Sequence, residues 1–317
     1  MQIIKSVVEL NIIMIVDIHT HLAYHKIFPE RFIEEVSAKL LTDNIQQNRF
    51  VLQLVKNSLK DMDGESFIKK MDESGIDKSV LLIADFGYFL GEPEFTLEQM
   101  YALHYEVKKK FPDRIFVFSG VDPRRGQAYI DLFKDSITKY SFDGLKLYPP
   151  CGFELDDSCV YPLYDICKQY NIPVLTHTGP SLNSMRTEEK YPQSILNVSR
   201  EYPDINFILA HAGARCIEQT IDTIKKRDNI YCDISTFQAT MTQDEMEVNF
   251  RKMMDSCPDN LLFGTDFPMF IMSTSQKQLV NSVKSLKKIT DKEKEKLLCL
   301  NAQRILGIEN EVLGHEY

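Results

Sequence analysis

The chain has 317 residues, of which 44% are apolar and 26% are charged, and its formal net charge is −9. This composition is typical of a globular protein with a sizeable core. The acidic balance argues against nucleic acid, whose phosphates require a basic face, and no apolar run approaches the ~20 residues of a membrane-spanning helix. We therefore expect a small-molecule substrate, with neither nucleic acid nor a membrane as a partner.

The first residues and the cysteines indicate the domain organisation and the cellular location of the protein. Residues 1–13 resemble a signal peptide only superficially, because Glu9 and Asn11 interrupt the apolar stretch and no small-residue cleavage site follows. We interpret 1–13 as an N-terminal extension and 14–317 as a single domain. The seven cysteines include no C-x-x-C pair, which indicates reduced thiols and a cytoplasmic location.

Short runs rich in Val, Ile, Leu and Phe alternate with amphipathic helical patterns along the chain. The runs are 15–21, 79–85, 115–122, 143–149, 172–178, 205–212, 229–235 and 260–267, and the clearest helices are 96–111, 126–140, 160–170, 215–227 and 244–255. Runs of this kind are typical of buried parallel strands. Strict alternation predicts right-handed βαβ units, and eight units predict an α/β fold, a (β/α)8 TIM barrel.

Two stretches of the sequence are additional to the eight strand–helix units of a simple barrel. Residues 32–59, between the first two strands, predict one or two inserted helices. An insertion at the C-terminal mouth would form a lid or a wall of the substrate site, and the alternative is that it packs against a partner subunit. After the eighth strand, 277–287, 292–300 and 301–306 predict C-terminal helices that close the barrel from outside.

Polar side chains with metal-binding capacity stand where predicted strands end. His19 and His21 are two residues apart on one strand, so the period of two directs both imidazoles to the same face. His177, His211 and Asp266 each end an apolar run. Because the C-terminal ends of barrel strands converge on one mouth, we expect the five side chains to lie close together.

The five side chains suit a metal-dependent reaction. His19, His21, His177 and Asp266 offer three nitrogens and one oxygen to a divalent metal ion, and the number of imidazoles favours Zn²⁺ over Fe²⁺, Co²⁺ or Mn²⁺. Such an ion lowers the pKa of its bound water from ~15.7 towards ~7. We expect Asp266 to serve both as ligand and as general base, and His211 to polarise the substrate, stabilise an oxyanion or move a proton.

The segment Asp17–His21 resembles the D-x-H-x-H start of the amidohydrolase superfamily of metal-dependent barrels. Further motifs narrow the resemblance to the amidohydrolase-related (amidohydrolase 2) branch, which includes aminocarboxymuconate-semialdehyde decarboxylase: Gly144–Pro149, His177–Gly179, His211–Gly213, Phe263–Pro268 and Asn301–Leu306. The resemblance runs from Met14 to about Ile308. It implies the same four metal ligands, His211 as the catalytic histidine, and a possible homodimer.

Lys146 is the ambiguous residue near this site. It alternates with Leu145 and Leu147, so we expect it to point into the barrel, where a lysine must pair, lose its proton or be modified. In binuclear members of the superfamily a lysine at the end of this strand is carboxylated and bridges two metals, which would imply a second metal here. The alternative is that Lys146 binds a substrate carboxylate or pairs with an acidic neighbour. Tyr148 and Arg186, which follow the fourth and fifth strands, are further candidates for substrate contacts.

These features predict a metal-dependent hydrolase that uses a metal-bound water or hydroxide to cleave an amide, lactone or related carbonyl bond of a small substrate. The alternative is a non-hydrolytic, metal-dependent decarboxylase of a small unsaturated or aromatic carboxylic acid, whose site should hold cationic groups for the carboxylate. A TatD-like nuclease fits less well, because Lys146 stands where those enzymes have a glutamate. A catalytically silent binding barrel is disfavoured, because all five site residues are present.

Overall fold

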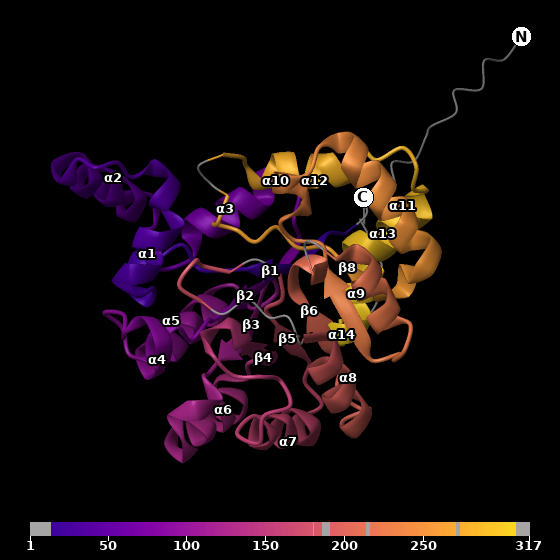
Figure 1. The fold of residues 1–317 in the computed structure, drawn as a ribbon, viewed down its shortest axis with the longest axis horizontal. Coiled ribbons are helices and arrows are strands. Elements are labelled where there is room, and N and C mark those ends of the chain that lie inside the picture. The colour runs from indigo at the N-terminus through magenta and orange to yellow at the C-terminus, as the bar shows by residue number, and fades with distance from the viewer. Residues whose placement is uncertain (1–13, 180, 186–190, 214–215, 271–272, 309–317) are drawn as a thin grey trace, which may run out of the picture.

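The structure is a computed structural model that describes residues 14–179, 181–185, 191–213, 216–270 and 273–308. Within them, eight parallel strands form one sheet in the order of the chain. Figure 1 shows the strands gathered at the centre of the molecule with helices around them. The strands are β1 (Val16–Thr20), β2 (Lys78–Leu82), β3 (Ile115–Gly120), β4 (Gly144–Leu147), β5 (Val174–Thr176), β6 (Phe207–Leu209), β7 (Ile230–Asp233) and β8 (Leu261–Leu262).

The last strand returns to the first through backbone hydrogen bonds. Ile18 N donates to Phe263 O at 2.9 Å, and Asp266 N donates to His19 O at 2.8 Å. These bonds join the chain on either side of the sheet's open edge, so the predicted (β/α)8 TIM barrel is confirmed. The strands are shorter than predicted because the polar residues that end each apolar run have already left the strand ladder.

Helices fill the intervals between strands, and five of them lie where the sequence predicts them. The main ones are α5 (Leu97–Lys110), α6 (Gln127–Tyr140), α7 (Tyr161–Tyr170), α8 (Tyr191–Glu201), α9 (Ile217–Ile224) and α11 (Gln243–Ser256), with short α4 (Gly87–Leu90) and α10 (Phe237–Thr240). Short 3₁₀ turns occupy His25–Ile27, Ala38–Leu40, Pro123–Arg125, Pro149–Cys151 and Pro258–Asn260. None of the described helices is long and apolar enough to cross a membrane. The predicted extension at residues 1–13 lies outside the described part of the chain.

Apolar side chains alternate between two layers. One buried cluster takes a side chain from nearly every strand, including Val80, Phe118, Leu175, Ile208 and Leu262, and therefore fills the interior of the barrel. A second, larger cluster takes the alternate strand positions and packs them against the helices. This alternation directs Lys146 inward, because its neighbours on β4 both belong to the outer cluster.

The C-terminal segment covers the bottom of the barrel instead of only lying outside it. It comprises α12 (Gln276–Lys284), α13 (Asp291–Glu295), a π-helical stretch (Lys296–Leu300) and α14 (Asn301–Leu306). Ala302 and Ile305 join the interior cluster, and Asn301 Nδ2 donates to Leu261 O at the start of β8. The tail therefore seals the N-terminal end of the barrel, which leaves the opposite mouth open for chemistry.

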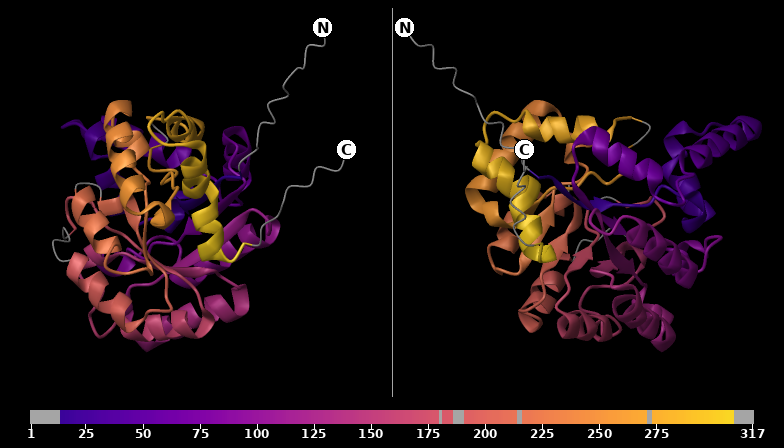
Figure 2. Two further views of the ribbon diagram at one scale, coloured as in Figure 1. Left: turned by 90° about the vertical axis from the view of Figure 1, so that its right-hand side faces the viewer. Right: turned by 180° about the vertical axis from the view of Figure 1, so that it is seen from behind.

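The inserted helices are α1 (Glu30–Val36) and α2 (Ile45–Ser58), followed by α3 (Glu65–Ser74). Phe32 of α1 stacks on Phe86 after β2, with ring centroids 4.7 Å apart, and Glu35 accepts a hydrogen bond from Ser184 N after β5. Helix α1 therefore borders the mouth, as the wall interpretation expects. Helix α2 extends away from the barrel (Figures 1 and 2) and exposes the apolar side chains of Phe50 and Leu54. The homodimer stays a prediction.

Candidate metal centre

A bulge in β1 aims the first two histidines. Along the β1–β2 ladder, Asp17 pairs with Ser79 but Thr20 pairs with Leu81, so β1 holds one residue more than its partner. Ile18 therefore joins the interior cluster while the adjacent His19 also turns its imidazole into the site. Bulges commonly re-aim side chains next to functional sites in this way. His19 and His21 share a face, as predicted.

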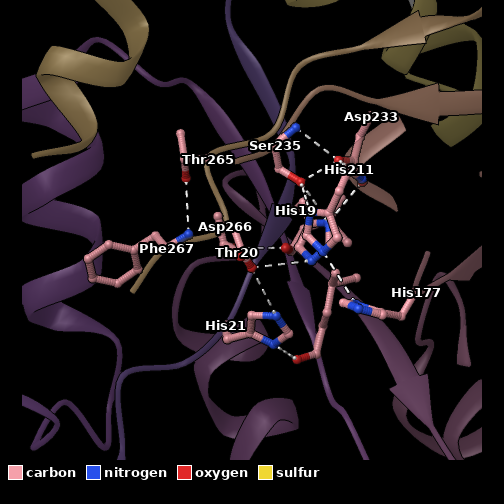
Figure 3. A network of polar contacts seen from close by, with 12 residues as sticks. His19, Thr20, His21, His177, His211, Asp233, Ser235, Thr265, Asp266 and Phe267 are labelled. Carbon is pink, nitrogen blue, oxygen red and sulfur yellow. Dashed lines mark hydrogen bonds and ion pairs between the residues drawn. The ribbon is translucent and has the colours of Figure 1, made fainter. Parts of the chain in front are cut away.

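Two histidine nitrogens converge on one carboxylate oxygen (Figure 3). His19 Nε2 lies 3.5 Å and His21 Nε2 lies 3.6 Å from Asp266 Oδ1. Two donors held ~2.1 Å from one ion in a tetrahedral arrangement are ~3.4 Å apart. The spacing thus fits a single metal ion between the three donors, and these residues form a candidate metal-binding group.

Each of the two histidines is held by its other nitrogen. His21 Nδ1 contacts Leu82 O at 2.8 Å, and His19 Nδ1 contacts Asp233 Oδ2 at 2.8 Å. A carbonyl oxygen can only accept, so His21 Nδ1 carries the proton and its Nε2 lone pair faces Asp266. Such partners orient metal-binding histidines and increase their basicity. Asp233 was missed by the sequence analysis, although it too ends an apolar strand.

Burial and neighbouring charges set the protonation of these groups. Burial lowers the pKa of His19 to about 4, against the opposing effect of Asp233, and lowers that of His211 as well. Burial alone would raise the pKa of Asp233, but the adjacent His19 holds it well below its usual range. At neutral pH the imidazoles of His19 and His211 are therefore neutral and Asp233 is an anion, which is the state that metal binding needs.

His177 and His211 complete the group without entering the three-donor cluster. His211 Nε2 lies 3.3 Å from His177 Nδ1, and His211 Nδ1 lies 2.8 Å from Ser235 Oγ. The His177 ring also stacks on Tyr148, with centroids 4.2 Å apart. The structure thus brings all four predicted histidines together with Asp266. His177 is the predicted ligand that lies outside the tightest group of donors.

The strand-eight side of the site is fixed by Asp17, the first residue of the D-x-H-x-H segment. Its carboxylate accepts hydrogen bonds from Thr265 N and Oγ1 at 3.0 and 2.6 Å and from His19 N at 3.2 Å. These bonds hold the turn in which Asp266 adopts a left-handed φ of 55°. A Cβ on Gly264 would lie 2.9 Å from His19 Cβ, so only glycine lets β8 approach β1 this closely.

Lys146 enters the interior from β4 with only 2% of its surface exposed. Its Nζ has no hydrogen-bond partner among the described residues. Burial lowers its pKa to about 8, while the negative charges of Asp233 and Asp266, which also lie in the barrel interior, act in the opposite direction. Tyr148, two residues further along the chain, stacks on His177. Arg186, the other predicted substrate contact, lies outside the described residues.

The chain is similar to a known family in sequence and to known structures in fold. A sequence model of the amidohydrolase family matches residues 16–308. The chain belongs to the amidohydrolase family. The resemblance drawn from the sequence motifs is therefore confirmed. No curated protein sequence is significantly similar to the chain.

Several solved structures share the fold at low sequence identity. An uncharacterised TIM-barrel protein from Bordetella bronchiseptica is 20% identical with a TM-score of 0.67, over 93% of this chain and 98% of that one. A 2,6-dihydroxybenzoate decarboxylase in complex with 2,6-dihydroxybenzoate is 15% identical with a TM-score of 0.65, over 92% and 100%. A 5-carboxyvanillate decarboxylase from Novosphingobium aromaticivorans, with manganese and 4-hydroxy-3-methoxy-5-nitrobenzoic acid, is 13% identical with a TM-score of 0.66, over 93% and 96%.

These comparisons correct the predicted reaction. The similar structures with a named activity are mainly decarboxylases of aromatic acids. A probable 2-pyrone-4,6-dicarboxylic acid hydrolase has a lower TM-score of 0.61. The prediction of a hydrolase is therefore wrong by this comparison, and its stated alternative is the better supported. Both reactions use the same donors, so the ligand pattern in the sequence could not separate them.

Proposed function

We propose that this protein is a metal-dependent decarboxylase of a small aromatic carboxylic acid. The observation that carries the proposal is the buried Lys146 amine, which faces the metal centre and has no hydrogen-bond partner among the described residues. A buried cation without a partner is costly, and a carboxylate supplied by a substrate would satisfy it. The similarity in fold to decarboxylases of aromatic acids supports the same reaction.

Two other cations near the mouth, among the residues that the structure describes, are already paired. Arg125 holds Asp85 with two hydrogen bonds of 2.6 and 2.7 Å and also contacts Glu92. Arg124 donates to both oxygens of Asp122. These guanidinium groups have their charge neutralised by the protein itself, so Lys146 is the cation we assign to the substrate carboxylate.

The donor set fits one divalent ion. We assign His19, His21 and Asp266 as its ligands, with His177 as the fourth, and we propose zinc because imidazoles predominate. A bound ion would supply positive charge that neutralises the oxygens of an acidic substrate. Manganese in the similar 5-carboxyvanillate decarboxylase shows that a barrel of this fold can also carry that metal. A second metal would require a carboxylated Lys146, and we propose instead that its amine stays unmodified.

Decarboxylation breaks the bond between the ring and the carboxylate. CO₂ leaves, the electron pair stays on the ring carbon, and that carbon takes up a proton. We assign the proton transfer to His211 Nε2, whose lone pair takes up a proton from solvent and passes it to the ring carbon, because burial lowers the pKa of His211 and so makes the protonated form a ready donor. The rings of Tyr148 and Phe86, in T-shaped contact at 4.8 Å, give an apolar aromatic surface beside His177 against which a planar substrate would fit.

The decisive experiment uses isotopes from the solvent to distinguish decarboxylation from hydrolysis. Zinc- or manganese-loaded protein is incubated with a panel of hydroxylated benzoic acids in D₂O, and in H₂¹⁸O with lactone and amide substrates. We expect CO₂ release and one deuterium at the carbon that carried the carboxylate, without ¹⁸O in any product. Incorporation of ¹⁸O with no CO₂ would overturn the decarboxylase assignment and restore hydrolysis.

Metal content and protein mass test the state of Lys146. We expect about one metal per chain, because the two possible groups of donors among the described residues share His19, and an intact mass without an added CO₂. The contrary result would be two metals per chain and an added CO₂ mass in the wild type, with the second metal and the added mass both absent from Lys146→Met. That result would show a carboxylated lysine and contradict our assignment.

A further inference from the structure

Asp233, a carboxylate that is not among the metal ligands assigned above, organises the hydrogen bonds behind them. Asp233 Oδ1 accepts from the backbone N–H groups of His211 and Ser235, each at 3.0 Å, and also contacts Ser235 Oγ. Its second oxygen, Oδ2, contacts His19 Nδ1 at 2.8 Å. Asp233, His211 and Ser235 are all buried, so water does not compete for these bonds. Figure 3 shows the three side chains side by side on one flank of the site.

The hydrogen bonds among Asp233, Ser235 and His211 allow only one assignment of donors and acceptors. A hydroxyl has one proton to donate, and a carboxylate oxygen can only accept. Ser235 must therefore donate its proton to Asp233 Oδ1. His211 Nδ1, 2.8 Å from the same hydroxyl oxygen, can then only be the donor in that contact. A neutral imidazole with its proton on Nδ1 carries its lone pair on Nε2.

We propose that Ser235 is a positioning residue that fixes His211 as the tautomer protonated at Nδ1 and so keeps its Nε2 lone pair towards His177 and the metal centre. The proposal rests on the assignment of proton transfer to His211. His19 Nδ1 is also 3.3 Å from Ser235 Oγ, but its shorter contact with Asp233 Oδ2 takes its proton.

The same order of donors and acceptors extends from His211 to His177, one of the proposed metal ligands. His211 Nε2 faces His177 Nδ1 at 3.3 Å. Since Nε2 of His211 is the acceptor, His177 Nδ1 carries a proton, and the lone pair of His177 lies on its own Nε2. The chain Asp233–Ser235–His211–His177 thus places the lone pair of His177 on Nε2, just as Leu82 O and Asp233 place the lone pairs of His21 and His19 on Nε2.

The local backbone is built for this arrangement. His211 has a left-handed φ of 59° and Ala212 one of 42°, conformations that L-residues seldom adopt. The turn places His211 N on Asp233 and the imidazole on Ser235 at once. Strain of this kind persists where surrounding bonds over-determine it, and it is often found at functional sites.

Histidine side-chain ¹H–¹⁵N spectra test the tautomer directly. Full-length protein with ¹⁵N-labelled histidine is measured metal-free and zinc-loaded, and the His211 signals are assigned by their loss in His211→Gln. We expect a protonated-type shift at Nδ1 and a lone-pair-type shift at Nε2 in both states. In Ser235→Ala we expect the two shifts to move towards each other, because the two tautomers then interconvert. A lone-pair-type shift at Nδ1 of the wild type would overturn the proposal.

The matched control is Ser119→Ala, which removes another fully buried hydroxyl, bonded to Ser136 away from the site. We expect it to leave the His211 shifts and the turnover unchanged, while Ser235→Ala lowers kcat at least about tenfold with little change in KM. Unchanged His211 shifts in Ser235→Ala would refute the inference even if turnover falls. Because the shifts are read without substrate, they remain informative if decarboxylation itself is not observed.

Discussion

Replacing Asp233 with asparagine tests how the metal centre is held. The asparagine side chain would have the same shape, but one of its two terminal atoms becomes an N–H donor. If the amide oxygen keeps the three donors now on Oδ1, the amide nitrogen faces His19 Nδ1, which the structure places 2.8 Å from Oδ2. Two donors then oppose each other, and His19 must lose the bond or move its proton to Nε2, the nitrogen assigned to the metal.

The size of the effect follows from these contacts. A hydrogen bond to a charged group contributes about 1.5–3 kcal/mol. Loss of such a partner of a metal-binding histidine typically weakens metal binding about 10–100-fold, which corresponds to about 1.4–2.8 kcal/mol. We expect the zinc Kd of Asp233→Asn to rise within this range.

The assay is competition for zinc with a chromophoric chelator. Asp143→Asn is the matched control, since Asp143 is partly buried and bonds a cation, Lys108, and a backbone N–H, that of Val117, outside the site. We expect the control to keep the wild-type Kd. A wild-type zinc Kd in Asp233→Asn, with an unchanged circular dichroism spectrum, would refute the assignment of His19 as a ligand oriented by Asp233.

Three further outcomes are expected. Lys146→Met should lower kcat/KM about 10–100-fold through loss of a charged hydrogen bond, yet leave the metal-free protein at least as stable in urea, because a buried amine without a partner disappears; retained activity would contradict its role with substrate. His21→Ala and His177→Ala should each reduce metal content measured by plasma emission, and a chelator should lower the Tm of the wild type but not of His21→Ala. Burial lowers the pKa of His104 to about 4 from 6.5, so the neutral form is favoured in the folded state and stability is lost as pH falls below 6.5. Between about pH 8 and about pH 5, the wild type should lose about 2 kcal/mol more unfolding free energy than His104→Gln, and equal losses would refute this.

Much of the fold could be predicted because buried parallel strands leave a strong local signal. The eight apolar runs correspond to β1–β8, and the polar residue after each run marks the barrel mouth. The ends were less predictable: β8 is only Leu261–Leu262, although its apolar run continues to Phe267. The predicted run length reflects burial, whereas the strand ends where the backbone turns to place Asp266.

The choice of reaction lies beyond the ligand pattern. The same imidazoles and carboxylate serve hydrolysis and decarboxylation, so His19, His21, His177 and Asp266 alone led to the wrong reaction. What separates the two is the placement of a substrate carboxylate, and the pertinent observation is the partnerless amine of Lys146 among the described residues. Its position, facing two carboxylates but bonded to neither, depends on β4, β7 and β8 being closed into one barrel.

By itself, the sequence determined the barrel, its family and the side chains that gather at the mouth, because strand periodicity and strand ends are local properties. Only the tertiary structure decided which partner holds each of them. The bulge in β1 that aims His19 arises from its pairing with β2. Asp233 and Ser235 lie more than two hundred residues from His19 in the chain, and no local pattern indicates their contact. Such distant partners determine the tautomer of each histidine and which nitrogen keeps a lone pair for a metal. The reason is that the hydrogen-bond partner of one imidazole nitrogen decides which of the two nitrogens carries the proton.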